Sequence, residues 1–260
     1  MVFKFIKRNS LKKQPLDDRC NAFLERELPL WEKLKPDARK KLSGDLQILA
    51  EEKSFEGCGG LELTDEMIWL ICAQAGLLLQ GEASDYYPNL DSVLVYPTRY
   101  VAPVEEYYEG GIVGSGEEVR SGESWQGGVL VLAWDEIRPG KRRKHQHYNL
   151  VLHEFAHQVD DDLGIYRRVE AWLETGEDDG MEWVSKFGKS YQQFLKNIRF
   201  NRPVFFDTYG AENPAEFFAV VTEMFIMNPR EFVRRDAELF GLMKEAYNFN
   251  PLDIFEPGNE

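Results

Sequence analysis

The stretch that decides the fold of this chain runs from Tyr148 to Asp160 and reads YNLVLHEFAHQVD. Apolar residues fill it around the pattern His-Glu-Phe-Ala-His, which predicts a buried helix. Positions i and i+4 of a helix project from one face, so His153 and His157 can offer two imidazoles to one metal ion. Glu154 need not be a ligand, because its carboxylate can hold a water at the metal and take its proton.

Two interpretations of this pattern stay open from the residues alone. It fixes only three of five positions, so two hydrogen-bonded histidines beside a solvated Glu154 form the plainer alternative. Three polar groups are costly to bury in so apolar a helix unless they are paired, and this favours a metal site. A catalytic zinc site also needs a third protein ligand and an open position.

Asp160 shares a helix face with His153 at i+7. It lies about 10 Å along the axis, too far for both side chains to share one metal comfortably. We therefore expect Asp160 to bond a histidine nitrogen or a neighbouring backbone group. The alternative is a charge that ends the helix before Gly164. Asp161 and Asp162 are expected to be solvated.

A second apolar helix offers a better third ligand. Residues 208–225 read TYGAENPAEFFAVVTEMF, in which Asn213 and Pro214 form a helix start. Glu216 and Glu223, seven residues apart, share one face of a helix that is otherwise apolar nearly all round. Two carboxylates on one stripe of a buried helix favour a cation, with Glu216 as ligand and Glu223 as its support. The alternative is that Glu216 only closes a capping box.

Three segments together make the chain recognisable. They are the His-Glu-Phe-Ala-His helix, the Pro-Ala-Glu start at 214–216 preceded by Tyr209, and GESWQGGVLVLAW at 122–134. They resemble the Mlc titration factor A family of bacterial zinc peptidases over most of the chain, roughly residues 18–253. Residues 209–218 are also similar to the catalytic domain of anthrax lethal factor, a member of the broad zincin class.

Carried onto this sequence, the resemblance implies a Zn²⁺ ion held by His153, His157 and Glu216. It implies Glu154 as the general base and Tyr209 as a hydrogen-bond donor to the transition state, with an ordinary packed tyrosine as the alternative. It further implies a cytosolic, weakly active, aminopeptidase-like enzyme that binds the glucose repressor Mlc.

The resemblance leaves the partner and the substrate open. The acidic stretch at 174–179 and the loop at 107–121 share no pattern with the family. We predict a zinc-dependent peptidase that acts on a peptide or protein substrate and also binds an Mlc-like transcriptional repressor of sugar uptake. The alternative is a non-catalytic regulatory protein that sequesters a repressor and has a structural zinc site. Endo- versus aminopeptidase preference and oligomeric state are not indicated.

Length and composition indicate how large a core the chain can form. With 260 residues, 43% of them hydrophobic, the chain can bury a substantial core. We expect an α+β, mainly helical zincin-like fold with a small sheet beside the active-site helix. Residues 1–14 are expected to form a flexible basic tail and 15–260 a single domain, with a helical lobe over about 15–80 and a sheet and catalytic lobe over about 81–260.

Net charge and cysteine content limit which kinds of partner and which compartment we expect. A net charge of −14 speaks against direct nucleic-acid binding. The basic run at 141–144 and the spare His145 and His147 are expected to be solvated, although the run could instead dock an acidic partner or a peptide C-terminus. The apolar stretch at 67–79 is broken by Gln74 and is too short to span a membrane. With three scattered cysteines, we expect a cytoplasmic protein without a membrane partner.

Hydrophobic periodicity and turn residues predict the remaining elements. Helices are expected over 16–34 with a bend at Pro29, over 37–53, over 64–79 with Thr64 as cap, and from 149 onward; strands are expected over 92–100 and 128–134, separated by a Gly-rich charged loop. Gly127 and Gly128 favour an edge position for the strand at 129–134, where a substrate peptide could add to the sheet. The alternative is an interior strand.

Overall fold

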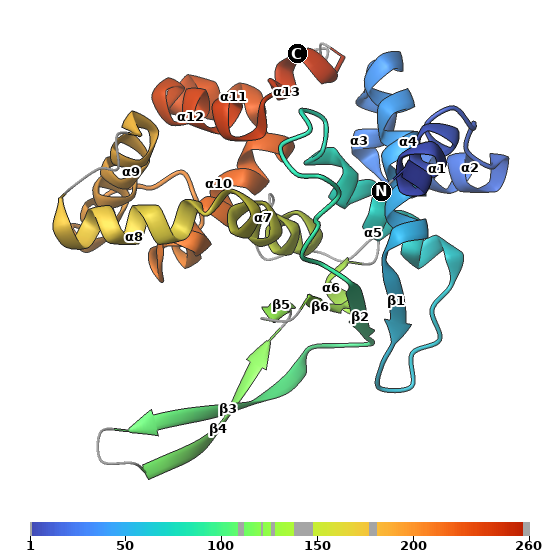
Figure 1. Cartoon of the computed structure of the whole chain (residues 1–260). Helices are drawn as coiled ribbons and strands as arrows, with labels where there is room; N and C mark the ends of the chain where they lie inside the picture. Colours follow the sequence, from blue (N-terminus) through green and yellow to red (C-terminus); the bar gives the residue numbers. More distant parts are fainter. Residues whose placement is uncertain are drawn as a thin grey trace.

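The computed structural model describes residues 2–108, 112–120, 122–125, 128–137, 148–176 and 181–256. The fold is α+β and mainly helical, as predicted, with helix α7 (Leu150–Leu163) near its centre (Figure 1). The N-terminal helices lie on one side of α7 and the later helices on the other. The strands lie together at a third side.

Five helices build the N-terminal part: α1 (Val2–Leu11), α2 (Asp18–Glu27), α3 (Pro29–Lys33), α4 (Pro36–Glu52) and α5 (Asp65–Leu77). The predicted bend is confirmed, because α2 ends before Pro29 and α3 begins with it. Thr64 caps α5 as predicted by accepting a hydrogen bond from the backbone N–H of Met67 at 3.4 Å.

Within the segment expected to form a basic tail, residues 2–11 form helix α1, which packs against α4. Arg8 pairs with Glu52 and Asp85, and its guanidinium lies over the Tyr86 ring. The basic character of the segment is therefore matched by acidic side chains on the surface beneath it. Sequence periodicity cannot reveal such partners, because they lie far along the chain.

The sheet has four strands in the order β1-β2-β6-β5, formed by Ser54–Gly57, Ser92–Tyr96, Val129–Ala133 and Gly122–Trp125. The first three are parallel, and β5 pairs antiparallel with β6. The expectation that 129–134 forms an edge strand is therefore wrong, because β6 is paired on both sides and the strands at the two edges are β1 and β5. A strand so apolar, with Leu130 and Leu132 fully buried, is typical of the interior of a parallel sheet.

The segment between β2 and β5 was expected to be a loop, and this is also wrong. Strands β3 (Tyr100–Tyr108) and β4 (Ile112–Arg120) pair antiparallel as a long hairpin that projects away from the helices (Figure 1). Glycine and charged residues weaken the strand pattern there, whereas regular backbone pairing still satisfies the N–H and C=O groups.

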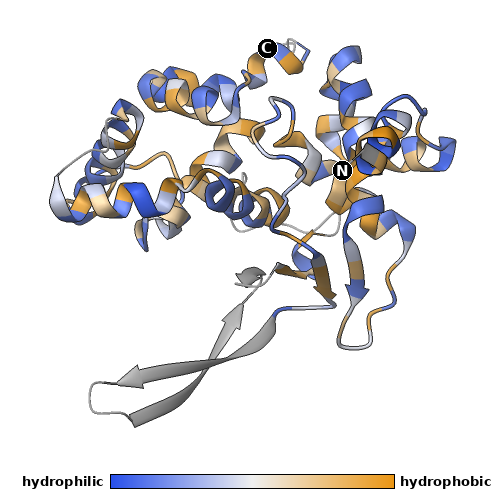
Figure 2. Ribbon diagram, in the orientation of Figure 1, coloured by the Kyte–Doolittle hydropathy of each residue, from blue (hydrophilic) through white to orange (hydrophobic). Residues whose placement is uncertain are grey.

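A short helix that was not predicted, α6 (Trp134–Ile137), follows β6. From residue 149 onward the described chain is helical, as predicted: α7, α8 (Ile165–Thr175), α9 (Glu182–Arg199), the 3₁₀ turn η1 (Thr208–Ala211), α10 (Pro214–Met227), α11 (Pro229–Arg235), α12 (Ala237–Tyr247) and α13 (Pro251–Ile254). Helix α10 is buried on nearly all sides, as its apolar sequence predicts. It packs against α7 and η1. Figure 2 shows apolar residues gathered in the central helices and in β2 and β6.

Some expectations fall on residues that the structure does not describe. These are the basic run at 141–144, His145 and His147, and residues 177–179 of the acidic stretch. Within the described ranges, no helix combines the length and the apolar character that crossing a bilayer requires.

Candidate metal centre

Helix α7 carries the His-Glu-Phe-Ala-His pattern in the predicted place. Asn149 caps it by accepting a hydrogen bond from the backbone N–H of Leu152 at 3.1 Å. Gly164, with a φ of 66°, ends it in the left-handed conformation that glycine adopts without strain. His153 and Glu154 are 4% and 6% exposed, so the helix presents its polar groups inside the molecule.

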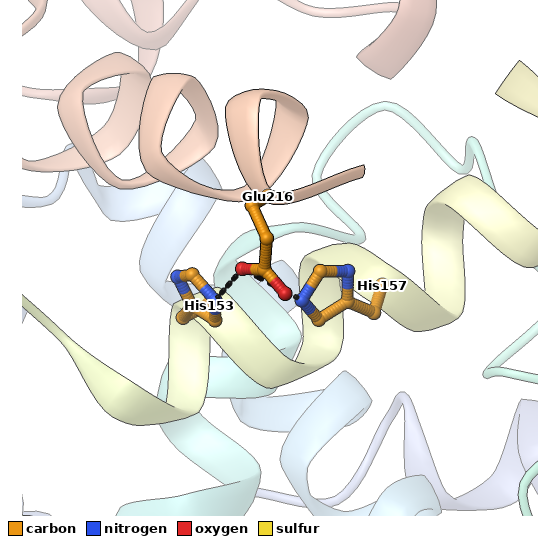
Figure 3. A group of neighbouring side chains, drawn as sticks. All are labelled: His153, His157 and Glu216. Carbon is orange, nitrogen blue, oxygen red and sulfur yellow. Dashed lines mark hydrogen bonds and ion pairs between the residues drawn. The ribbon is translucent and has the colours of Figure 1, made fainter. Parts of the chain in front are cut away.

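Helix α10 brings in the third side chain. Pro214 stands in its first turn, and Asn213 caps it by accepting a hydrogen bond from the backbone N–H of Glu216 at 3.0 Å. The capping-box alternative would turn the Glu216 carboxylate back towards the helix start. Instead, that carboxylate points at His153 and His157 of the neighbouring helix (Figure 3).

The three side chains meet with the dimensions of a metal site. The Nε2 atom of His153 lies 2.9 Å from Oε2 of Glu216, and Nε2 of His157 lies 3.6 Å from the same oxygen. Ligand atoms on a tetrahedral zinc at about 2.0–2.1 Å lie about 3.3 Å apart, so these separations bracket the required one. Among the described residues, this His-His-Glu group has one ligand atom from each residue within 4.8 Å of the others. The donor set of two imidazoles and a carboxylate fits zinc.

Glu223 holds the opposite side of His153. Its Oε1 atom lies 2.9 Å from Nδ1 of His153, and its Oε2 atom accepts a hydrogen bond from the backbone N–H of Asn149. A carboxylate on Nδ1 fixes the tautomer in which Nδ1 carries the proton and Nε2 faces the metal. Glu223 was predicted to have this supporting position, whereas no part in it was predicted for Asn149. The signal available for Asn149 was its place directly before the apolar run, where a helix cap is expected.

Burial and pairing set the charges of the centre. Burial raises the pKa of Glu154 above the ordinary glutamate value, and the nearby imidazoles offset this only in part. Burial alone would also raise the pKa of Glu216, but hydrogen bonds with His153 and His157 outweigh it and lower the pKa to about 2. Burial disfavours the charged form of His153, yet its bonds to Glu216 and Glu223 raise its pKa well above the ordinary value. Glu154 is therefore a buried carboxyl group with a raised pKa beside the three candidate ligands.

Tyr209 lies in η1, next to the start of α10. Asp207 caps the turn by accepting a hydrogen bond from the backbone N–H of Tyr209 at 2.9 Å. A side chain at Gly210 would clash with Val220, so the turn packs closely on α10. The Tyr209 ring centroid lies 5.8 Å from that of His153, and the residue is 46% exposed. This exposure speaks against the packed-tyrosine alternative.

Asp160 stands apart from the three candidate ligands. Its Oδ1 atom accepts a hydrogen bond from the backbone N–H of Tyr166 at 2.7 Å, which is the backbone contact expected for it. Asp162 was expected to be solvated, but this is wrong. Its carboxylate accepts hydrogen bonds from Ser84 and from Asn89, two side chains in a loop that sequence patterns do not connect to α7.

The chain is similar to proteins of a known family. A model of the glucose-regulated metallopeptidase M90 family matches residues 3–248. An uncharacterised protein of Synechocystis sp. is 37% identical over 247 residues, which cover 95% of this chain and 89% of that protein. Proteins named Mlc titration factor A from Yersinia pestis and Yersinia pseudotuberculosis are 27% identical over 237 residues, covering 86% of this chain and 83% of each relative.

The family resemblance read from the sequence is therefore confirmed. The family match spans nearly the whole chain and includes α7 and α10, the two helices that carry the His-His-Glu group. This protein belongs to the glucose-regulated metallopeptidase M90 family.

Proposed function

We propose that this protein is a zinc-dependent peptidase whose ion is held by His153, His157 and Glu216. The observation that carries the proposal is the convergence of these three side chains beside the buried carboxylate of Glu154. The family and the His-His-Glu group imply a divalent metal. The preference of two imidazoles and one carboxylate for Zn²⁺ makes zinc the specific proposal.

The chain's own residues divide the work of amide hydrolysis. A bound zinc ion supplies a Lewis acid that polarises the carbonyl and lowers the pKa of water. Glu154 takes the proton of the attacking water and passes it to the leaving amine, a role that suits a carboxylate whose pKa is raised by burial. Tyr209, exposed beside the centre, donates a hydrogen bond from its hydroxyl to the developing oxyanion.

The sheet edge beside α7 is the proposed binding site for the substrate backbone. Strand β5 (Gly122–Trp125) is one of the two edge strands and lies against α7. An edge strand offers unpaired N–H and C=O groups, so an extended peptide can add to it through main-chain hydrogen bonds. This moves the proposed docking strand from 129–134 to β5. An aminopeptidase-like preference remains part of the proposal.

A peptide-substrate screen combined with metal analysis tests the proposal. The purified protein should contain about one zinc per chain and hydrolyse at least one peptide class, with activity lost to a chelator and restored by zinc. Glu154→Gln is the matched control, because it keeps the three ligands and removes only the base. Hydrolysis that is equal in the wild type and in this variant would mean that the activity belongs to a contaminant or to another base.

A second role is favoured by the relatives named Mlc titration factor A. We propose that this chain also binds an Mlc-like transcriptional repressor in the cytoplasm. The Glu154→Gln variant distinguishes the two roles. A repressor-binding protein with a structural metal keeps its effect on a target promoter in the Glu154→Gln variant, whereas an effect that depends on proteolysis is lost in it.

A further inference from the structure

One buried polar residue has no part in the proposed chemistry. Gln74 interrupts the apolar helix α5 and is 3% exposed. Its flanking residues, Ala73 and Ala75, are fully buried. A polar side chain left without hydrogen bonds in such a place costs about 1–3 kcal/mol, so its partners show what it does.

Gln74 leads directly to the metal centre. Its Oε1 atom accepts a hydrogen bond from Nδ2 of Asn149 at 2.7 Å. The backbone N–H of Asn149 donates to Oε2 of Glu223, whose Oε1 atom lies 2.9 Å from Nδ1 of His153. All four residues are 3–4% exposed. One polar path therefore runs from α5 through the start of α7 and the middle of α10 to a candidate ligand.

The orientation of both amides in this path is fixed by backbone groups. Nε2 of Gln74 donates to the carbonyl oxygen of Leu70 at 3.0 Å, which turns its Oε1 towards Asn149. Oδ1 of Asn149 accepts the backbone N–H of Leu152 at 3.1 Å, which turns its Nδ2 towards Gln74. Flipping either amide would place donor against donor or acceptor against acceptor. The path has a single consistent arrangement.

We propose that Gln74 is a positioning residue that acts on the metal centre through Asn149 and Glu223. The proposal rests on the proposed metal site. Asn149 holds its backbone N–H on Glu223, and Glu223 holds His153 in the tautomer that leaves Nε2 for the metal. Gln74 fixes the Asn149 side chain from α5, so the N-terminal helices contribute to the geometry of a centre built on α7 and α10.

The test replaces Gln74 with methionine, which keeps the volume and removes both hydrogen bonds. Zinc affinity is measured by competition with a chromogenic chelator. Outer partners of metal ligands typically contribute 10–100-fold to affinity, and Gln74 lies further out, so we expect a loss of about tenfold. Tyr87→Phe is the matched control, because the fully buried Tyr87 donates to the carbonyl of Ala75 on the same helix at 2.6 Å. It should lower thermal stability and leave zinc affinity unchanged.

Asn149→Ser gives an independent arm, and it serves in full if the methionine variant does not fold. Serine keeps a helix cap and the backbone N–H but loses the amide that contacts Gln74. Asn149→Ser should also weaken zinc binding. The double variant Gln74→Met/Asn149→Ser should lose no more zinc affinity than whichever single variant loses more, since both substitutions act through one path.

Two outcomes would overturn the proposal, and a third would show that the metal site itself is wrong. Equal zinc affinity in Gln74→Met and Tyr87→Phe overturns it, and so does an additive loss in the double variant. Failure of the metal site itself is distinguishable, because the wild-type protein would then bind no zinc or would bind it equally well in His153→Ala.

Discussion

Glu216 and Glu223 contact the same imidazole, but substitutions at the two positions should have opposite effects. Loss of Glu223 should mainly lower stability, whereas loss of Glu216 should mainly lower zinc affinity. In Glu223→Leu two buried donors, the backbone N–H of Asn149 and Nδ1–H of His153, lose their acceptor. Each such loss costs about 1–3 kcal/mol, so the two together should lower the free energy of unfolding of the metal-free protein by about 2–6 kcal/mol. In a chain of this size that corresponds to a fall in Tm of about 5–20 °C.

Glu216→Ala should cost much less stability. His153 keeps Glu223, so no buried charge is left without a partner, and the carboxylate lies at the partly open side of the centre, with 16% of its side chain exposed. We expect a loss of about 1–2 kcal/mol, or a fall in Tm of a few degrees. Zinc affinity, in contrast, should be lost almost completely, because one of three ligands is gone.

Calorimetric melts in chelator and competition assays for zinc measure the two effects separately. Glu223→Leu should retain weakened zinc binding, about 10–100-fold below wild type. The reverse pattern of zinc affinities and melting temperatures would contradict both assignments. Full zinc affinity in Glu216→Ala would mean that Glu223 or Asp160 is the third ligand. A Glu223→Leu melt equal to that of wild type would mean that the Glu223 hydrogen bonds do not stabilise the fold.

Three further predictions concern single side chains. Glu154→Gln should keep zinc and lower peptide hydrolysis by about 10² or more, as expected for loss of a general base; near wild-type turnover would place the base elsewhere. Tyr209→Phe should lower kcat and kcat/KM by similar factors, since a lost oxyanion donor costs about 2.7–4 kcal/mol, and an unchanged kcat would remove Tyr209 from the mechanism. Burial raises the pKa of Asp160 from its ordinary 3.8 to about 6. The folded, metal-free protein therefore binds a proton more tightly than the unfolded chain, and stability is lost as pH rises through about 6. Asp160→Asn should remove that dependence in melts from pH 4 to 7 while its amide oxygen still accepts the Tyr166 N–H.

Local patterns predicted the elements that carry the candidate centre. The apolar run around His153 and the Asn-Pro start before Glu216 each lie within one helix, so 3.6-residue periodicity and capping preferences suffice to find them. The same holds for the Thr64 cap of α5. These signals work because each depends on neighbours within a few positions of the chain.

The incorrect predictions concern contacts between distant segments. Strand β6 was assigned to the edge because Gly127 and Gly128 permit close approach, but strand order depends on β5 and β2, which pair with it on its two sides. The hairpin β3–β4 is held by backbone pairing, which leaves little trace in residue type. The Gln74–Asn149 contact joins residues 75 positions apart. A lone glutamine in an apolar helix signals that a buried partner exists but not which residue it is.

The spacing of the two glutamates on α10 explains why His153 is central to the metal-free protein. Seven residues span about two helical turns, so Glu216 and Glu223 lie on one face about 10 Å apart along the axis. The imidazole of His153 fits between them and contacts one carboxylate through each ring nitrogen. Its raised pKa follows from this double contact, which outweighs the cost of burying the charge. A metal at Nε2 would replace the contact between His153 and Glu216 and leave the Glu223 contact at Nδ1 in place, so metal binding and protonation of His153 are linked.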